Sequence, residues 1–160
     1  MAILLSQSEQ VGVLFEVISV ADDWVFSHIG FQHYVAKEND FATWVEGFLD
    51  IYESDLEGFA RELASFVEGG PRRQEFRFEP TAEPSFEFRF QAGSLARTVD
   101  VGASVALDVK RILDVTIPTA YGDNRISLQL LTDWERLRRF AEQFSLGTAR
   151  LLRTQPQGNW

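Results

Sequence analysis

The sequence contains no cysteine, and this absence excludes several kinds of protein. Without thiols the chain can form neither a disulfide framework nor a thiolate metal site, which fits a reducing compartment. No apolar run approaches the roughly 18 residues of a transmembrane helix. Residues 1–10 carry no basic segment ahead of an apolar one, so they do not resemble a secretory signal. The sequence therefore predicts a soluble, cytoplasmic protein with no membrane partner.

The common catalytic and nucleotide-binding motifs are also missing. The chain has no Gly-x-Gly-x-x-Gly, no Gly-Lys-Ser/Thr phosphate loop, no Gly-x-Ser-x-Gly and no His-Glu-x-x-His. Neighbouring carboxylates occur at Asp22 and Asp23, Asp50 and Glu53, and Asp55 and Glu57. A turn or a helix start explains the first and last of these pairs without catalysis. We expect no enzymatic activity, no catalytic residues and no cofactor.

Histidine is scarce, with only His28 and His33 in the chain. Because they are five positions apart, the two side chains would point to opposite faces of one strand. A shared divalent metal would need a bend between them and acids such as Glu16 or Glu38. The simpler interpretation is one surface histidine and one that is hydrogen-bonded near a strand end, and we expect no metal site.

Positive charge is lacking in the first half of the chain. The formal net charge is −9, and residues 1–70 hold 13 acidic against 2 basic side chains, whereas residues 71–160 hold 11 against 13. An acidic field disfavours direct binding to nucleic acid, whose binders are basic as a rule. It attracts a basic protein partner instead. The alternative is that acidic surface only keeps a small protein soluble.

Hydrophobic residues are plentiful, at 45% of the chain with 14 phenylalanines, which is enough for one packed core. The clearest helix covers residues 54–67, where Ser54 and Glu57 fit a capping box. Its apolar stripe comprises Leu56, Phe59, Ala60, Leu63, Phe66 and Val67. Gly69 and Gly70, followed by a proline, predict the end of this helix.

Most other segments favour strands. The predicted strands cover residues 11–20, 24–31, 41–52, 76–78, 86–90, 98–105, 112–117 and 125–131. Residues 41–52 also fit a helical stripe, but Gly47 weakens a helix and favours the strand. Residues 80–84 are expected to form the turn of a hairpin whose phenylalanines face inward and whose outer charges pair across the strands.

A second helix is predicted to open with a capping box from Thr132 to Glu135 and to end near Gly147. Residues 151–160 are predicted to form a flexible tail after a single domain over residues 1–150. The expected fold class is α+β: a mostly antiparallel sheet, curved or sandwich-like, of about seven to nine strands with two amphipathic helices packed on it.

The order of elements and several local patterns resemble the WapI-like bacterial immunity family and related small bacterial domains. The matching residues are Asp55-Leu56-x-x-Phe59-x-x-x-Leu63, the strands within residues 76–105, and Leu128-x-Leu130-Leu131-Thr132-Asp133-x-x-x-Leu137-x-x-Phe140. The resemblance implies a cytoplasmic immunity protein that binds the toxic domain of a bacterial toxin, often a nuclease, and blocks it.

An acidic surface would suit such a basic toxin domain. Residues 38–68 contain nine acidic side chains and one basic one. The residues predicted to form the partner-binding face are Glu46, Asp50, Glu53, Asp55 and Glu57. The alternative function is a structural or regulatory homo-oligomer, a homodimer for example, that associates through an apolar patch around Trp44, Phe48 and Tyr52.

Overall fold

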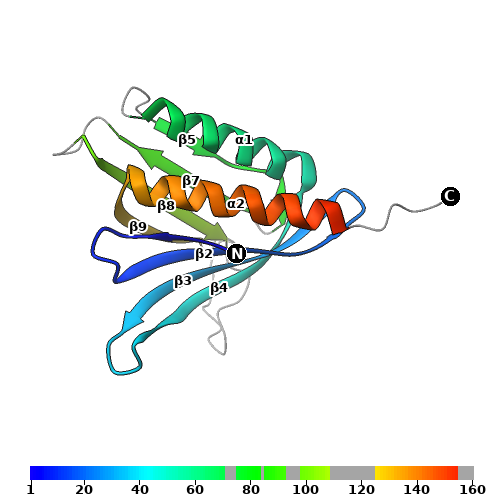
Figure 1. The fold of residues 1–160 in the computed structure, drawn as a ribbon. Coiled ribbons are helices and arrows are strands. Elements are labelled where there is room, and N and C mark those ends of the chain that lie inside the picture. Colours follow the sequence, from blue (N-terminus) through cyan, green and yellow to red (C-terminus); the bar gives the residue numbers. More distant parts are fainter. Residues whose placement is uncertain (71–74, 84, 93–97, 109–124, 155–160) are drawn as a thin grey trace.

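The computed structural model describes the chain except for residues 71–74, 84, 93–97, 109–124 and 155–160 (Figure 1). The described residues form nine strands and two helices. The strands are β1 (Ala2–Leu5), β2 (Val11–Ala21), β3 (Trp24–Val35), β4 (Asp40–Tyr52), β5 (Glu75–Phe78), β6 (Ala82–Glu83), β7 (Phe86–Gln91), β8 (Asp100–Asp108) and β9 (Arg125–Asp133). The helices are α1 (Glu53–Gly69) and α2 (Trp134–Thr154).

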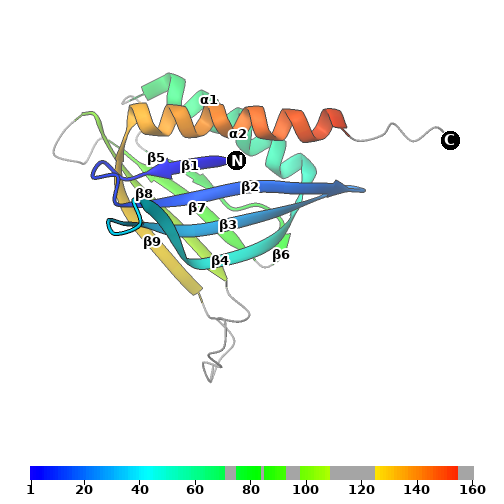
Figure 2. The ribbon, with the colours of Figure 1, turned by 60° about the horizontal axis from the view of Figure 1, so that its bottom comes forward.

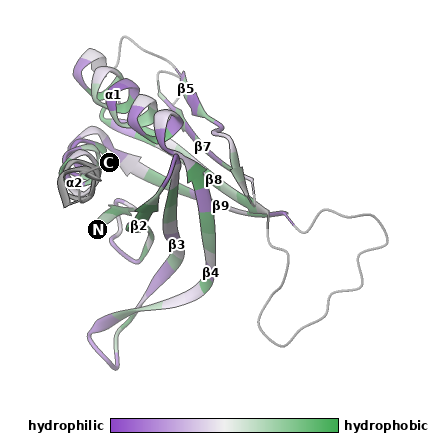
Figure 3. Ribbon diagram, turned by 90° about the vertical axis from the view of Figure 1, so that its right-hand side faces the viewer, coloured by the Kyte–Doolittle hydropathy of each residue, from purple (hydrophilic) through white to green (hydrophobic). Residues whose placement is uncertain are grey.

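The strands form two antiparallel sheets. The first sheet has the order β1-β2-β3-β4-β6, and the second has the order β5-β7-β8-β9. Both helices lie on the same side of the sheets (Figures 2 and 3). The predicted α+β class, with antiparallel strands and two packed helices, is confirmed. No helix in the described part of the chain is both long and apolar enough to cross a membrane.

Two junctions hold the sheets together. At one junction, the backbone N–H of Gln7 donates to the carbonyl of Leu131 at 2.8 Å, and the Thr132 hydroxyl donates to the carbonyl of Leu5 at 2.7 Å. At the other, the short strand β6 pairs with β4 shortly before the chain enters β7. The inner faces of both sheets are thereby turned towards one common core.

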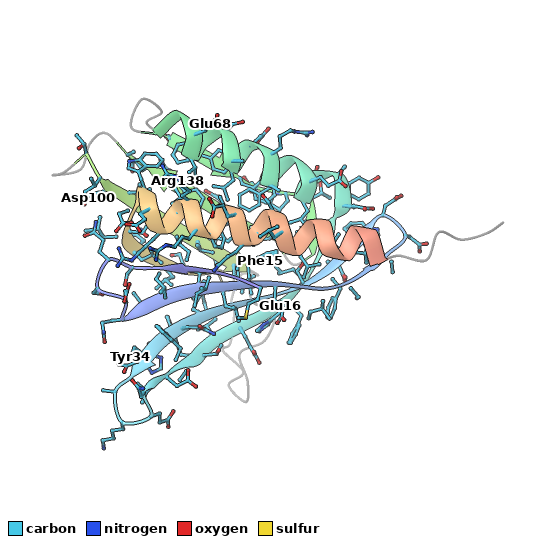
Figure 4. The ribbon with its side chains drawn as sticks, in the orientation of Figure 1. Phe15, Glu16, Tyr34, Glu68, Asp100 and Arg138 are labelled. Carbon is cyan, nitrogen blue, oxygen red and sulfur yellow. The ribbon has the colours of Figure 1, made fainter. Side chains whose placement is uncertain are left out.

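Phenylalanine rings fill that core. Phe59 of α1 packs on Phe78 of β5, with ring centroids 4.0 Å apart, and on Phe88 of β7 at 5.5 Å. Phe15 of β2 reaches the same cluster beneath α2, 5.0 Å from the ring of Phe144 (Figure 4). Eleven of the phenylalanines in the described residues are buried: Phe15, Phe31, Phe59, Phe66, Phe76, Phe78, Phe86, Phe88, Phe90, Phe140 and Phe144 have at most 9% of their surface exposed. Both sheets and both helices therefore share one aromatic core.

The predicted phenylalanine hairpin is confirmed. Phe76 lies opposite Phe90 and Phe78 opposite Phe88 in the β5–β7 pair. On the outer side, Arg77 pairs with Glu87 at 3.0 Å, as expected for cross-strand charges. The segment between them is not only a turn, because β6 within it adds an edge strand to β4. Strands β1 and β6 were not predicted, and the predicted strand over residues 112–117 lies outside the described residues.

The predicted capping box of the first helix is wrong. The helix begins at Glu53, its N-cap is Tyr52, and no side chain caps it. Its end is as predicted, because Gly70 has a φ of 57° and its N–H donates to the carbonyls of Phe66 and Val67. The reason for the early start is that the Glu53 N–H already donates to the carbonyl of Asp23 at 2.8 Å. Ser54 consequently falls within the first turn.

The second helix also differs from the prediction at both ends. Its cap is Asp133 and not Thr132, because the Asp133 carboxylate accepts the backbone N–H of Arg136 at 2.9 Å. The Thr132 hydroxyl is already donated to β1. Gly147 does not end the helix, which continues to Thr154, so the first four residues of the predicted tail are helical. Residues 155–160 lie outside the described part.

Gly47 of β4 lies against the side chain of Leu107 of β8. A Cβ added there would lie 2.7 Å from Cδ2 of Leu107, a fully buried side chain. We expect Gly47→Ala to lower the free energy of unfolding by about 1–3 kcal/mol, the usual cost of overpacking a core. Gly58→Ala in α1 is the matched control, because the added methyl meets only a guanidinium nitrogen of Arg61 at 4.0 Å. It should stabilise the helix by about 0.8–1 kcal/mol. Urea denaturation measures both, and equal effects would contradict the close packing of the sheets.

Candidate functional site

The outer face of β3 and β4, turned away from the helices, is the unusual surface of the molecule. Side chains alternate along each strand. On β3 the inward residues Val25, Ile29 and Phe31 are fully buried in the core. The intervening residues Trp24 and Phe26 therefore face outward, although they are also large and apolar.

Aromatic rings pair across the two strands on this outer face. Trp24 lies opposite Tyr52, with ring centroids 5.5 Å apart, and Phe26 stacks on Phe48 at 5.7 Å. The exposed fractions are 40% for Trp24, 36% for Phe26, 51% for Phe48 and 38% for Tyr52. We call these four side chains the outer aromatic patch. Their number and proximity distinguish the patch from the single apolar side chains that occur on any protein surface.

Carboxylates interrupt the outer aromatic patch. Asp50 lies directly opposite Phe26 and between Phe48 and Tyr52 along β4. Glu46 accepts a hydrogen bond at 2.9 Å from Nε2 of His28, if that nitrogen carries the proton. The His28 ring in turn stacks on Phe48 at 4.9 Å. The patch is therefore amphipathic, with apolar rings and acidic groups on adjacent positions.

A second group of acids lies where β4 meets α1. Burial raises the pKa of Glu53 above its ordinary value of 4.5, and the charges of Glu57 and Asp23 raise it further. Three carboxylates are thus crowded at one helix start. Such crowding is relieved when a cation approaches or when a proton binds.

Asp55 makes a contact within the protein that the sequence did not predict. Its carboxylate accepts the backbone N–H of Thr81 at 2.8 Å, and the carbonyl of Thr81 accepts the N–H of Tyr52 at 3.0 Å. Asp55 therefore ties α1 to the segment before β6. Of the five predicted residues, Glu46 and Asp50 lie on the outer face of β4, whereas Glu53, Asp55 and Glu57 lie at the start of α1.

Among the described residues, no arginine of residues 71–160 forms an ion pair with these acids. Within the described ranges, the ion pairs of these arginines are Arg77 with Glu79 and Glu87, Arg89 with Glu75, Arg125 with Glu87, Arg136 with Glu9 and Asp133, and Arg139 with Glu135. Among the described acids of residues 1–70, only Glu9 and Glu46 pair with a basic side chain, the latter with His28. The negative charge predicted from the sequence therefore remains available to a partner.

Sequence reasoning missed Trp24, Phe26 and His28 as site residues. The sequence did contain an indication of this site. Apolar residues occur at both odd and even positions of β3, and therefore on both of its faces, whereas a half-exposed strand normally carries them on one face. Trp44, which the sequence grouped with Phe48 and Tyr52, is also exposed. It lies at a β-bulge, and its ring contacts Phe31 of the inner face at 5.8 Å.

No metal-binding constellation occurs in the part of the chain that the structure describes, where no three His, Asp or Glu side chains lie close enough to hold an ion. His28 faces outward beside Glu46, and His33, at the opposite parity of β3, is not close to it. Comparisons of the chain with protein-family models, curated proteins and solved structures found no match.

The crowding at the start of α1 gives a pH-dependent prediction. A carboxyl group whose pKa is raised by folding stabilises the fold below its ordinary pKa of 4.5, and this contribution is lost as the pH rises through the folded value. Glu53→Gln should therefore gain stability relative to the wild type as the pH is raised from 4 to 7. Thermal unfolding in a pH series measures the difference.

The matched control removes the cause of the crowding. In a Glu57→Gln background the effect of Glu53→Gln at neutral pH should shrink, because one of the repelling charges is gone. A difference between Glu53→Gln and wild type that does not change with pH would rule out the raised pKa.

Proposed function

We propose that this protein is a non-enzymatic binding protein whose outer β3–β4 face docks a basic protein. The more specific proposal is a cytoplasmic immunity protein that neutralises a cognate bacterial toxin. The observation that carries it is the outer aromatic patch with Asp50 at its centre and no basic side chain of the described residues paired to that acid.

The residue composition of this face is more typical of a protein–protein interface than of an ordinary solvent-exposed surface. The cores of such interfaces are enriched in Trp, Tyr and Phe, and truncation of these side chains often costs the most affinity. Phe48 is more exposed than any other phenylalanine in the described residues, and it contacts both Phe26 and His28. Rings that are already packed on one another lose little freedom when a partner covers them.

The charge of the face suits a basic partner. Asp50 and Glu46 lie on it, and the crowded acids Glu53 and Glu57 follow at the next element of the chain. Long-range attraction of this kind raises association rates and selects against acidic partners. A toxin that cleaves nucleic acid has a basic surface for its substrate. An acidic protein that covers this surface would block it, which is the activity implied by the resemblance to immunity proteins.

Self-association is the second candidate, favoured by the exposed rings of Phe48 and Tyr52. A two-fold dimer through this face would bring the acids of one copy against the same acids of the other, since an isologous interface pairs a surface with itself. Like charges in that position oppose association. We therefore expect a monomer at micromolar concentration and neutral pH. Light scattering at low and high salt measures the mass, and a salt-independent dimer would favour the homo-oligomer.

Binding to the product of a toxin gene immediately upstream tests the main proposal. Asp50→Lys should weaken the complex by at least about thirtyfold, because reversal of a desolvated interface charge costs about 2 kcal/mol or more. Phe48→Ala should weaken it by about tenfold or more. Both residues are exposed, so neither change should lower the melting temperature appreciably. Calorimetric titration measures the affinities.

Glu62→Lys is the matched control for charge. Glu62 is an exposed acid on α1 without a hydrogen bond or ion pair in the described residues. The variant changes the net charge as Asp50→Lys does, so it should alter the association rate slightly and leave the dissociation rate unchanged. Equal losses for Asp50→Lys and Glu62→Lys would show that net charge, and not the outer face, governs binding.

A further inference from the structure

The arrangement around Asp50 says more about the partner than its charge. We propose that Asp50 and the outer aromatic patch form a subsite for an arginine side chain of the partner, and that this subsite prefers arginine to lysine. The inference rests on the proposed function, since it specifies which group of a basic partner reaches the face.

The frame of the subsite is fixed by strand register. On β4, Phe48 and Tyr52 flank Asp50 on the same face, two positions to either side. On β3, Phe26 lies directly opposite Asp50, and Trp24 lies opposite Tyr52. The carboxylate is therefore bordered by the Phe26–Phe48 stack on one side and the edge-to-face Trp24–Tyr52 pair on the other.

Asp50 is an exposed acid on this face without an ion pair among the described residues. The neighbouring Glu46 is engaged by Nε2 of His28 at 2.9 Å. No lysine or arginine of the described residues lies within ion-pair distance of Asp50, and its side chain is exposed. A cation that binds Asp50 therefore does not have to displace an existing partner. Asp55 differs in this respect, because its carboxylate already accepts a hydrogen bond from Thr81.

The chemistry of the frame favours guanidinium. A planar guanidinium can lie against an aromatic ring and at the same time donate two parallel N–H bonds to a carboxylate. A lysine ammonium is a compact, strongly hydrated charge that does not combine stacking with a two-point contact. Because Asp50 has aromatic side chains on three sides, both components of arginine recognition are present around one position.

The experiment uses the full chain and two synthetic probes, a short Gly-Arg repeat peptide and a Gly-Lys repeat peptide of equal length. At low ionic strength the wild-type protein should bind the arginine peptide at least about threefold more tightly than the lysine peptide, as an exposed cation–π contact predicts. Asp50→Asn and Phe48→Leu should each reduce this ratio towards one. Chemical shifts of the Asp50 amide and the Trp24 indole should move further with the arginine peptide than with the lysine peptide at equal concentration.

Two matched variants separate this subsite from general attraction. Glu62→Gln removes one acid away from the face and should weaken both peptides equally, without a change in the ratio. Trp44→Leu removes an exposed ring that contacts Phe31 of the inner face, and it should leave the ratio unchanged. A ratio of one in the wild type, or a ratio that survives Asp50→Asn, would overturn the inference.

The outcome also separates this inference from the proposed function. A toxin complex that is sensitive to Asp50→Lys but shows no arginine preference would leave the binding function standing and remove the subsite. Arginine preference without any complex with the upstream gene product would retain the subsite and reject the immunity function.

Discussion

The contact between Phe59 of α1 and the phenylalanines of the second sheet is the interaction on which the rest of the structure depends. Its ring meets Phe78 at 4.0 Å and Phe88 at 5.5 Å, and it also meets Phe144 of α2 in an edge-to-face contact at 4.9 Å. One side chain thus joins both helices to the second sheet. In a chain without disulfides, burial of such rings is the main source of stability, at about 25 cal/mol for each Å² of apolar surface. Because α1 follows β4 without a loop, its position fixes the end of β4.

The fixed position of β4 explains why the outer aromatic patch remains outside the core. The inner face of β4 is committed to the core through Leu49 and Ile51, which are fully buried, and through Gly47 against Leu107. The alternation of side chains then forces Phe48 and Tyr52 outward. A slip by one residue would bury them, but it would expose Leu49 and Ile51 and place a side chain larger than glycine against Leu107. The outer aromatic patch is therefore held by the packing behind it.

Local sequence patterns predicted both helices and most of the strands. The features that these patterns missed depend on contacts between residues far apart in the sequence. The alternation of Phe76, Phe78, Phe88 and Phe90 predicted a hairpin with the correct faces, because a two-residue period is a property of the segment alone. The capping box at Ser54 failed because the Glu53 N–H is held by Asp23, a residue of a distant turn. Strands β1 and β6 are short and are defined by their partners, so no pattern within them could reveal them. The hydrogen bond that Asp55 accepts from Thr81 could not be predicted for the same reason, since Thr81 is far away in sequence.

The distribution of paired and unpaired charge in the described residues follows the division into two sheets. On the second sheet, Arg77 and Arg125 both pair with Glu87, and Arg89 pairs with Glu75, so its outer face is internally balanced. The first sheet has no described arginine on β3 or β4 to do the same. Where β4 passes into α1, burial raises the pKa of Glu53, and the charges of Glu57 and Asp23 raise it further. A basic partner that covers this side would relieve the repulsion and bury the aromatic patch in one step, whereas on the second sheet it would have to break existing ion pairs. Under the proposed function, both effects would direct a cationic partner to the same face.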